Sequence, residues 1–419
     1  MSGLLAVVGC RQLVTLRGPA RPRMRAEMRE LGLIEDGALL VRDGRIVAAG
    51  KYAELKGQIV REAEIVDAAS GVVMPGFVDA HTHLVFAGNR ADEFERRIGG
   101  ATYQEIAASG GGIWATVRRT RETSEDQLLE HARRHARWFL DSGTTTLEAK
   151  SGYGLTTEAE CKLLRVARRL DRQGPLRIVP TFLGAHEIPE EYRNRPEQYV
   201  ETIVGEMLPR VASGRLAEYC DVFCEPQVFA LPSARRILEA AQARGLGLRI
   251  HADQFAQSGG ARLAAELGAA TADHLEHTDR ASIAALADAG VQPVLLPGSV
   301  YALGLDCYPD ARSMIDRGLA AVVATDFNPG SSPTASMPMI LSLACTRMRM
   351  TPAEAITAAT INPAYSLGRG AEIGSLEPAK CADFVVYRCG DFREIPYHFG
   401  VNLVNGVWIG GARSAVPET

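Results

Sequence analysis

Three histidines and one aspartate stand at the ends of separate apolar stretches, and their types suit a metal site. His81 and His83 follow VVMPGFVDA, His251 follows GLGLRI, and Asp326 follows LAAVVAT. Residues two apart in an extended strand point to the same side, so His81 and His83 can both face one ion. Neutral imidazoles and a carboxylate are ligands for Zn²⁺ or Fe²⁺. The set therefore predicts a divalent metal held by these four side chains.

Hydrolysis is the chemistry that such a site would support. A bound divalent cation lowers the pKa of water and makes hydroxide available near neutral pH, which can attack a carbonyl carbon. Asp326 can accept the water proton and pass it to a leaving nitrogen, while His274, which follows AATAD, hydrogen-bonds the attacking oxygen. We expect catalytic roles for Asp326 and His274, with a buried structural histidine as the alternative for position 274.

Other polar residues divide into candidates and controls. Arg90 lies seven residues after His83 and can grip a carboxylate with two prongs, although a surface salt bridge fits its spacing too. His131 and His135 are four apart in the arginine-rich EHARRHARW, whose charge opposes cation binding. We interpret that pair as part of a solvated helix face.

The elements that must position these residues form a repeating series. Apolar strand-like runs alternate with helical patterns such as ILEAAQARG, which indicates buried parallel strands in a (β/α)8 TIM-type barrel. The eight runs are VVMPGFVDAH, GTTTLEAK, RIVPTFLGAH, YCDVFCE, GLGLRIHAD, AATADHLEH, VQPVLLPG and LAAVVATDF. The candidate residues follow strands one, three, five, six and eight, whose ends meet at one mouth. A doubly wound open sheet is the alternative, but no G-x-G-x-x-G pattern follows the first strand.

The two ends of the chain share a hairpin pattern. GALLVRDGRIVAAG has a predicted turn at Asp43-Gly44, and VNLVNGVWIGG has one at Asn405-Gly406. Neither end alone has enough strands for its own core. We expect residues 1–72 and 370–419 to form one small β-sandwich domain, with the catalytic barrel at 73–369.

Composition favours a small-molecule enzyme of the cytoplasm. A formal charge of -4 over 419 residues gives no attraction to polyanions, so we expect no nucleic-acid partner. No run reaches the ~20 apolar residues of a membrane helix, and the N-terminus lacks a basic region before its apolar stretch. The eight scattered cysteines are expected to be thiols, with Cys220 and Cys224 too far apart along a strand to bind one ion.

Longer strings resemble the imidazolonepropionase family of the amidohydrolase superfamily. The order of His-x-His, two later histidines and a final aspartate is similar to the superfamily pattern. The more specific strings, which span nearly the whole chain, are MPGFVDAHTHLVFAGNR, KSGYGL, FLGAHEIPEEY, HADQ, TADHLEH, LLPGS, ATDFNPGSSP and IPYHFGVN.

The resemblance implies hydrolytic opening of 4-imidazolone-5-propanoate to N-formimidoyl-L-glutamate, an activity of histidine degradation. It implies metal ligation by the four residues above and substrate contacts by Arg90, Tyr153, His186, Gln254, Asn328, Gly330 and Ser331. A homodimer is implied as well. Some family members carry Glu at position 254. Gln254 can bind a ring but cannot act as a base, so Asp253 or Asp326 would have to serve.

The resemblance also bears on the number of metal ions. Two-metal members of the superfamily often bridge their ions through a lysine on strand four, and YCDVFCE has none, whereas Lys150 ends strand two. One ion per subunit is therefore expected, with zinc and iron both left open.

Three competing functions remain at this point. A deaminase or another cyclic amidase of the same superfamily would share the metal site, but Arg90, Tyr153 and His186 favour an anionic imidazolone. A non-catalytic barrel relative would show gaps in the ligand set, and none are present. A non-haem iron oxygenase uses two histidines and one carboxylate on an antiparallel barrel, which fits neither the ligands nor the β/α units.

Overall fold

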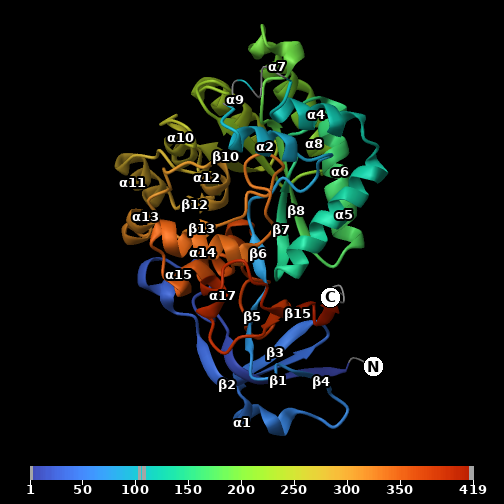
Figure 1. The fold of residues 1–419 in the computed structure, drawn as a ribbon, viewed down its shortest axis with the longest axis vertical. Coiled ribbons are helices and arrows are strands. Elements are labelled where there is room, and N and C mark those ends of the chain that lie inside the picture. The colour runs from blue at the N-terminus through green and yellow to red at the C-terminus, as the bar shows by residue number, and fades with distance from the viewer. Residues whose placement is uncertain (1–2, 102–104, 106–109, 415–419) are drawn as a thin grey trace.

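A computed structural model describes residues 3–101, 105 and 110–414, and it contains a barrel above a separate β-sheet (Figure 1). The barrel sheet runs in the order β13-β12-β11-β10-β9-β8-β7-β6, with each adjacent pair parallel. Its strands are β6 (Phe77–Asp79), β7 (Thr144–Lys150), β8 (Arg177–Ala185), β9 (Tyr219–Cys224), β10 (Gly247–Ala252), β11 (Thr271–His274), β12 (Gln292–Leu295) and β13 (Val322–Val323). The eight predicted strands and the (β/α)8 class are confirmed.

The sheet closes at its carboxyl end through residues that follow the first and last strands. Asp326 N donates to His81 O at 3.0 Å, and His83 N donates to Phe327 O at 2.8 Å. Thr82 and Phe327 form the parallel bridge between them. This closure brings the His-x-His pair and Asp326 together at the mouth.

Helices are arranged around the barrel (Figure 1). Their bounds are α2 (Ala91–Ile98), α4 (Ile113–Glu122), α5 (Glu125–Asp141), α6 (Thr157–Gln173), α7 (Pro196–Thr202), α8 (Leu208–Ser213), α9 (Leu231–Gln242), α10 (Gly260–Leu267), α11 (Arg280–Ala289), α12 (Pro297–Leu303), α13 (Ala311–Arg317), α14 (Met337–Met348), α15 (Pro352–Ala358), α16 (Ile361–Ser366) and α17 (Glu394–Tyr397). A π-helical turn at 203–207 joins α7 to α8. Helix α5 shows the local logic: Ser124 and Gln127 form a capping box at its start, and Leu128 and Phe139 are buried.

Both ends of the chain contribute to the second sheet. Its order is β16-β15-β14-β5-β1-β2-β3, with β4 also paired to β1. The strands are β1 (Leu4–Val14), β2 (Leu33–Arg42), β3 (Arg45–Lys51), β4 (Glu64–Asp67), β5 (Val72–Pro75), β14 (Phe384–Tyr387), β15 (Val404–Ile409) and β16 (Ala412–Ser414), and a short helix α1 (Tyr52–Leu55) follows β3. The limits 1–72 with 370–419 for this domain, and 73–369 for the barrel, stay a prediction.

The terminal sheet is one continuous sheet that curls back on itself. Leu5 and Leu39 from one half share an apolar cluster with Phe384 and Trp408 from the other. The two aromatic rings stack with centroids 4.9 Å apart. Ile46 N also donates to the carbonyl of residue 380 at 2.9 Å. The interior of the terminal unit therefore lies between the two halves of a single sheet.

The first predicted hairpin is confirmed. Arg42 pairs with Arg45 across a two-residue turn, in which Asp43 and Gly44 have φ of 53° and 73°. Positive φ at both positions is the requirement of a type I′ turn.

The second predicted hairpin is wrong in its position. Asn405 and Gly406 lie inside β15, where the register passes from Val386 opposite Gly406 to Tyr387 opposite Val404. Asn405 is therefore the extra residue of a β-bulge, a place where glycine is common in strands. The turn occurs instead at residues 410–411, two glycines with φ of 57° and 75°, which joins β15 to β16.

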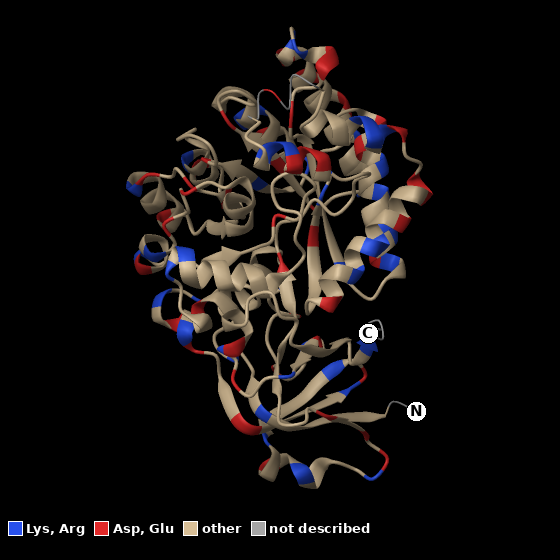
Figure 2. Ribbon diagram, viewed as in Figure 1, with Lys and Arg blue, Asp and Glu red and all other residues tan. Residues whose placement is uncertain are grey.

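Charged residues of both signs are interspersed over the outer helices (Figure 2). Arg169 of α6, for example, pairs with Glu125 and Asp126 of α5 at 3.1 and 2.9 Å. Within the described part of the chain, no helix is both long enough and apolar enough to cross a membrane.

Candidate metal centre and active site

Five buried side chains converge at the barrel mouth. Nitrogen or oxygen atoms of His81, His83 and Asp326 all lie within 4.8 Å of one another, and so do those of His81, His251 and His274. Asp326 Oδ1 is 3.5 Å from Nε2 of both His81 and His83. The ring centroids of His81 and His251 are 4.5 Å apart. The structure thus brings the four predicted ligands together and places His274 beside them.

Two buried carboxylates support the histidines from behind. His81 Nδ1 is 2.6 Å from Asp273 Oδ2, and His251 Nδ1 is 2.9 Å from Asp221 Oδ2. A carboxylate at Nδ1 keeps the proton on that nitrogen and leaves Nε2 with a free lone pair. His81 Nε2 is a buried atom with no hydrogen-bond partner among the described residues.

The protonation states suit metal ligation. Burial lowers the pKa of His81 and of His83, so both imidazoles are neutral. Burial alone would raise the pKa of Asp326, but the hydrogen bond from His83 and the charge of His274 bring it below its usual range. Neutral imidazole nitrogens around an ionised carboxylate are a donor set that fits a divalent cation.

Lys150 connects the supporting carboxylates inside the barrel. Its Nζ lies 2.7 Å from Asp221 Oδ2, 2.8 Å from Glu148 Oε1 and 3.5 Å from Asp273 Oδ2, and all four side chains have no exposed surface. Burial by itself disfavours the ammonium, but the three carboxylates raise the pKa of Lys150 above its usual value. The lysine is therefore a fixed positive charge beneath the mouth.

His274 differs from the other histidines because it faces an acid of its own. Its Nδ1 is 3.3 Å from Glu276 Oε1. Burial opposes the charged imidazolium, but Glu276 raises the pKa of His274, with smaller contributions from Asp326 and Asp273. The pKa of His274 is raised, whereas the pKa values of His81 and His83 are lowered. Neighbouring groups whose environments shift their pKa values in opposite directions usually have different roles.

Two predicted substrate contacts, Tyr153 and His186, lie against the ligand set. The His186 ring stacks on His83 with centroids 4.9 Å apart, and Tyr153 lies 5.7 Å from His83 and 5.3 Å from His186. Glu160, at the start of α6, accepts hydrogen bonds from the backbone N–H groups of residues 152, 154 and 155 at 2.7–2.9 Å. This buried carboxylate holds the loop that carries Tyr153.

Arg90 packs against the loop that follows β13. Arg90 Nε donates to Thr116 Oγ1 at 3.0 Å. A Cβ on Gly330 would clash with the Arg90 guanidinium as it now lies, so a larger residue would force that side chain to shift. Asn328 Oδ1 accepts from the N–H groups of Gly330 and Ser331 at 2.8 and 2.7 Å. Four predicted contacts, Arg90, Asn328, Gly330 and Ser331, therefore belong to one assembly.

Gln254, another predicted contact, follows β10 three residues after His251. Its backbone N–H donates to Glu225 Oε1 at 2.8 Å, and its side chain lines a small cavity with Glu276. Asp253, considered above as a base, already accepts hydrogen bonds at both oxygens: Oδ1 from Ser258 of its own loop and Oδ2 from Thr278 of the loop after β11. Of the two acids considered for proton transfer, Asp326 is the one at the metal ligands.

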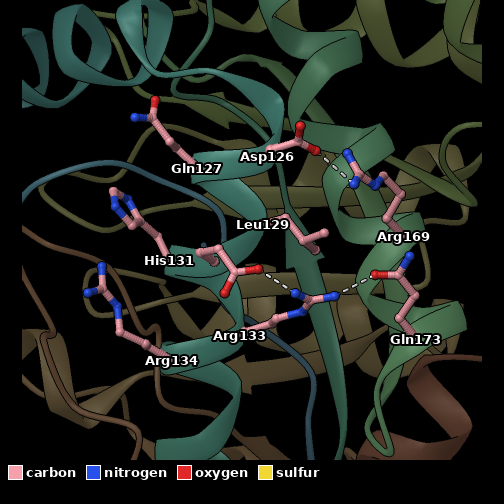
Figure 3. Close-up of a pocket in the computed structure, with 9 residues that line it drawn as sticks. Asp126, Gln127, Leu129, His131, Arg133, Arg134, Arg169 and Gln173 are labelled. Carbon is pink, nitrogen blue, oxygen red and sulfur yellow. Dashed lines mark hydrogen bonds and ion pairs between the residues drawn. The ribbon is translucent and has the colours of Figure 1, made fainter.

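The interpretation of His131 and His135 as a solvated pair is wrong for His135. Its ring is buried, stacks on Phe86 at 4.6 Å, and places Nδ1 3.0 Å from Leu84 O. His131 is partly exposed, and its side chain extends from α5 on the side away from Arg169 and Gln173 of α6 (Figure 3). A surface groove lies between α5 and α6, and Figure 3 shows Arg133 bonded to Gln173 across it.

The supporting charges were not recognised from the sequence. Glu148, Asp221, Arg249 and Asp273 are fully buried within barrel strands. That position was the available signal, because a charged residue in a buried strand needs a partner.

Fold and site together define a metal-dependent hydrolase, with a divalent metal site that contains histidine ligands at the mouth of a (β/α)8 barrel. A model of the amidohydrolase family matches residues 72–413, and a model of the bacterial imidazolonepropionase-like composite domain matches residues 37–58.

Curated relatives narrow the family. The imidazolonepropionase of Solibacter usitatus is 61% identical over 406 residues, covering 97% of each chain. That of Geobacillus kaustophilus is 49% identical over 411 residues, again covering 97% of each. The chain belongs to the imidazolonepropionase family of amidohydrolases.

Solved structures agree on the fold. An adenosine deaminase from Xanthomonas campestris with bound zinc superposes with a TM-score of 0.73 at 20% identity, covering 98% of this chain and 92% of that one. The guanine deaminase of E. coli gives 0.73 at 18% identity and covers 99% of each.

Proposed function

We propose that the protein opens the ring of 4-imidazolone-5-propanoate by hydrolysis to give N-formimidoyl-L-glutamate. The observation that carries the proposal is the loop after β13, which contacts both Arg90 and the ligand set: Gly330 lies against the Arg90 guanidinium, and Ser331 Oγ is 3.5 Å from Asp326 Oδ2. Tyr153 and His186 lie against the proposed ligand His83. The substrate is a cyclic amide that carries a propionate. Its ring would lie at the ligands and its carboxylate at the arginine. Relatives named imidazolonepropionase that match over nearly the full length support the same activity.

In this proposal His81, His83, His251 and Asp326 hold one divalent cation. When bound, the cation supplies Lewis acidity, which polarises the ring carbonyl and lowers the pKa of water. Asp326 would hold the proton released by the attacking water and deliver it to the ring nitrogen as the C–N bond breaks. The hydrogen bond from His83 and the charge of His274 outweigh the burial of Asp326 and hold its pKa below the usual range, which would keep this carboxylate ionised before the reaction.

The remaining side chains would orient the substrate and stabilise the charge that develops during the reaction. His274 would donate a hydrogen bond to the oxygen that gains charge. Arg90, Tyr153, Asn328, Gly330 and Ser331 would bind the carboxylate end, and His186 and Gln254 would contact the ring. The stack of His186 on His83 supports this placement because it sets the imidazole beside a proposed ligand.

The metal is proposed to be a single Zn²⁺ or Fe²⁺ per subunit. The Lys150 ammonium favours one ion, because it already neutralises the carboxylates behind the histidines. Metal analysis of protein purified from its native host, with and without oxygen, would separate the two ions.

We further propose a cytoplasmic homodimer. The eight unpaired cysteines support a reducing compartment. Light scattering after size-exclusion chromatography would test the dimer, and cell fractionation would test the location.

The direct test is loss of the imidazolone ultraviolet absorbance with freshly prepared substrate. Three proteins of measured metal content would be compared: wild type, His251→Ala and the control His398→Ala, whose side chain is exposed beside Glu394. Turnover by wild type and the control, but not by His251→Ala, is expected. A folded, metal-loaded wild type that leaves the imidazolone intact would refute the substrate.

A further inference from the structure

The chain turns sharply where β11 ends. His274 and Leu275 both have left-handed backbones, with φ of 81° and 71°. Such a pair without glycine is costly and persists only where its surroundings enforce it. Here Leu275 N donates to Ala252 O at 3.0 Å, and His277 N donates to Asp253 O at 2.9 Å. The end of β10 therefore holds the turn that places Glu276 beside His274.

Glu276 is buried although half of its carboxylate lacks a partner. Its side chain is 4% exposed, with Oε1 3.3 Å from His274 Nδ1. Oε2 is fully buried and has no hydrogen-bond partner among the described residues. An acid is rarely buried in this way unless it acts on a neighbour, and the neighbour here is the imidazole at the metal ligands.

The other acids around His274 are already engaged. Asp273 faces His81, Glu225 accepts from the backbone of residues 254 and 255, and Asp253 accepts from Ser258 and Thr278. Glu276 is thus the acid within reach of His274 Nδ1 that has no other side-chain partner among the described residues.

We propose that Glu276 is a positioning residue: its carboxylate holds the Nδ1–H of His274 and thereby aims Nε2 at the reacting oxygen. A base or donor imidazole oriented by a carboxylate at its far nitrogen is a recurring arrangement in hydrolases. The assignment rests on the proposed function, since it concerns the same site and step. It also explains why the chain accepts a left-handed turn at this point.

The kinetic test compares wild type with Glu276→Gln, alone and in a His274→Ala background, at matched metal content. Glu276→Gln should lower kcat about 10- to 100-fold, the range for residues that orient an active-site histidine, and change KM little. With His274→Ala present, the second substitution should have no further effect. Asp306→Asn is the control, because Asp306 is an exposed acid of the same small cavity and should keep wild-type rates.

Two kinetic results would overturn the proposal. One is a Glu276→Gln enzyme with wild-type kcat. The other is an equal reduction of kcat by Glu276→Gln in the wild-type and His274→Ala backgrounds, which would show that Glu276 does not act through the imidazole.

A readout without substrate separates this inference from the proposed function. In ¹⁵N-histidine-labelled, metal-loaded protein, the His274 signals are identified by their loss in His274→Ala. They should show a proton on Nδ1 in wild type and a changed tautomer in Glu276→Leu. Unchanged His274 signals would reject the role of Glu276 even if the enzyme turns over. If the His274 tautomer changes as expected but the wild-type enzyme does not hydrolyse the imidazolone, the role of Glu276 stands and only the proposed substrate is rejected.

Discussion

Replacing Lys150 with methionine would test the charge balance beneath the site. Methionine keeps most of the volume of the lysine stem and removes the ammonium. The substitution leaves Glu148 and Asp221 without the contacts of 2.8 and 2.7 Å that they now make, and removes the more distant one to Asp273. These carboxylates have no exposed surface, so water cannot replace the lost charge.

The expected loss of stability follows from that burial. Removing one partner of a buried ion pair costs about 3–5 kcal/mol. Unfolding entropy is about 2.1 cal/mol/K per residue, or about 0.9 kcal/mol/K for this length, so Tm should fall by about 3–6 °C. The fall measures uncompensated charge, since the change in packing volume is small.

Differential scanning calorimetry at matched metal content would measure the change. Lys162→Met is the control, because Lys162 Nζ donates to the backbone carbonyls of Thr120, Arg121 and Thr123 at 2.7–3.1 Å and contacts no carboxylate in the described structure. Its loss should cost about 1.5–3 kcal/mol, because a charged donor is removed from backbone acceptors without leaving a buried charge unpaired. A Lys150→Met protein that melts no lower than Lys162→Met would refute the reasoning.

Three further outcomes are expected. Arg90→Met should raise KM about 10- to 100-fold with little change in kcat, because it removes a hydrogen bond to a charged group worth about 1.5–3 kcal/mol; steady-state kinetics would show this, and an unchanged KM would contradict it. His251→Ala should lose its metal on dialysis against a chelator that wild type withstands, as measured by elemental analysis; equal retention would exclude His251 as a ligand. Glu160→Ala should lower the free energy of unfolding by about 2–4 kcal/mol, because it leaves three buried N–H groups without an acceptor, and urea titration would test this. If Glu160→Ala raises KM less than Tyr153→Phe does, Glu160 does not hold the loop that carries Tyr153.

The barrel and the four proposed ligands were predictable from the sequence because both depend on local patterns. Apolar runs separated by helical segments define the strands, and parallel strands place their carboxyl ends at one mouth. Such a run precedes each proposed ligand, namely His81, His83, His251 and Asp326. The inference that predicts the barrel therefore also predicts that these side chains meet at its mouth. The resemblance to a known family was needed for the ring that the site accepts, for most of the substrate contacts, for the number of ions and for the dimer.

The supporting charges were beyond that reasoning because they depend on partners far away in the chain. Lys150 meets Asp221 across 71 positions, and His81 meets Asp273 across 192. A strand pattern shows which face a side chain occupies but not which residue lies opposite. The same limit explains His135: the charged helix around it indicated solvent, whereas Phe86 from another segment covers its ring.

Backbone conformation connects the fold to the chemistry. Asp253, His274, Leu275 and Asp326 all have positive φ, and all follow or end the barrel strands that build the mouth. Each such residue costs about 1–3 kcal/mol, so its own sequence does not favour the conformation. Backbone bonds from neighbouring strands impose it, as the bond from Asp326 N to His81 O shows. The side chains that would handle protons are therefore aimed by strands other than their own, and their geometry depends on closure of the whole barrel.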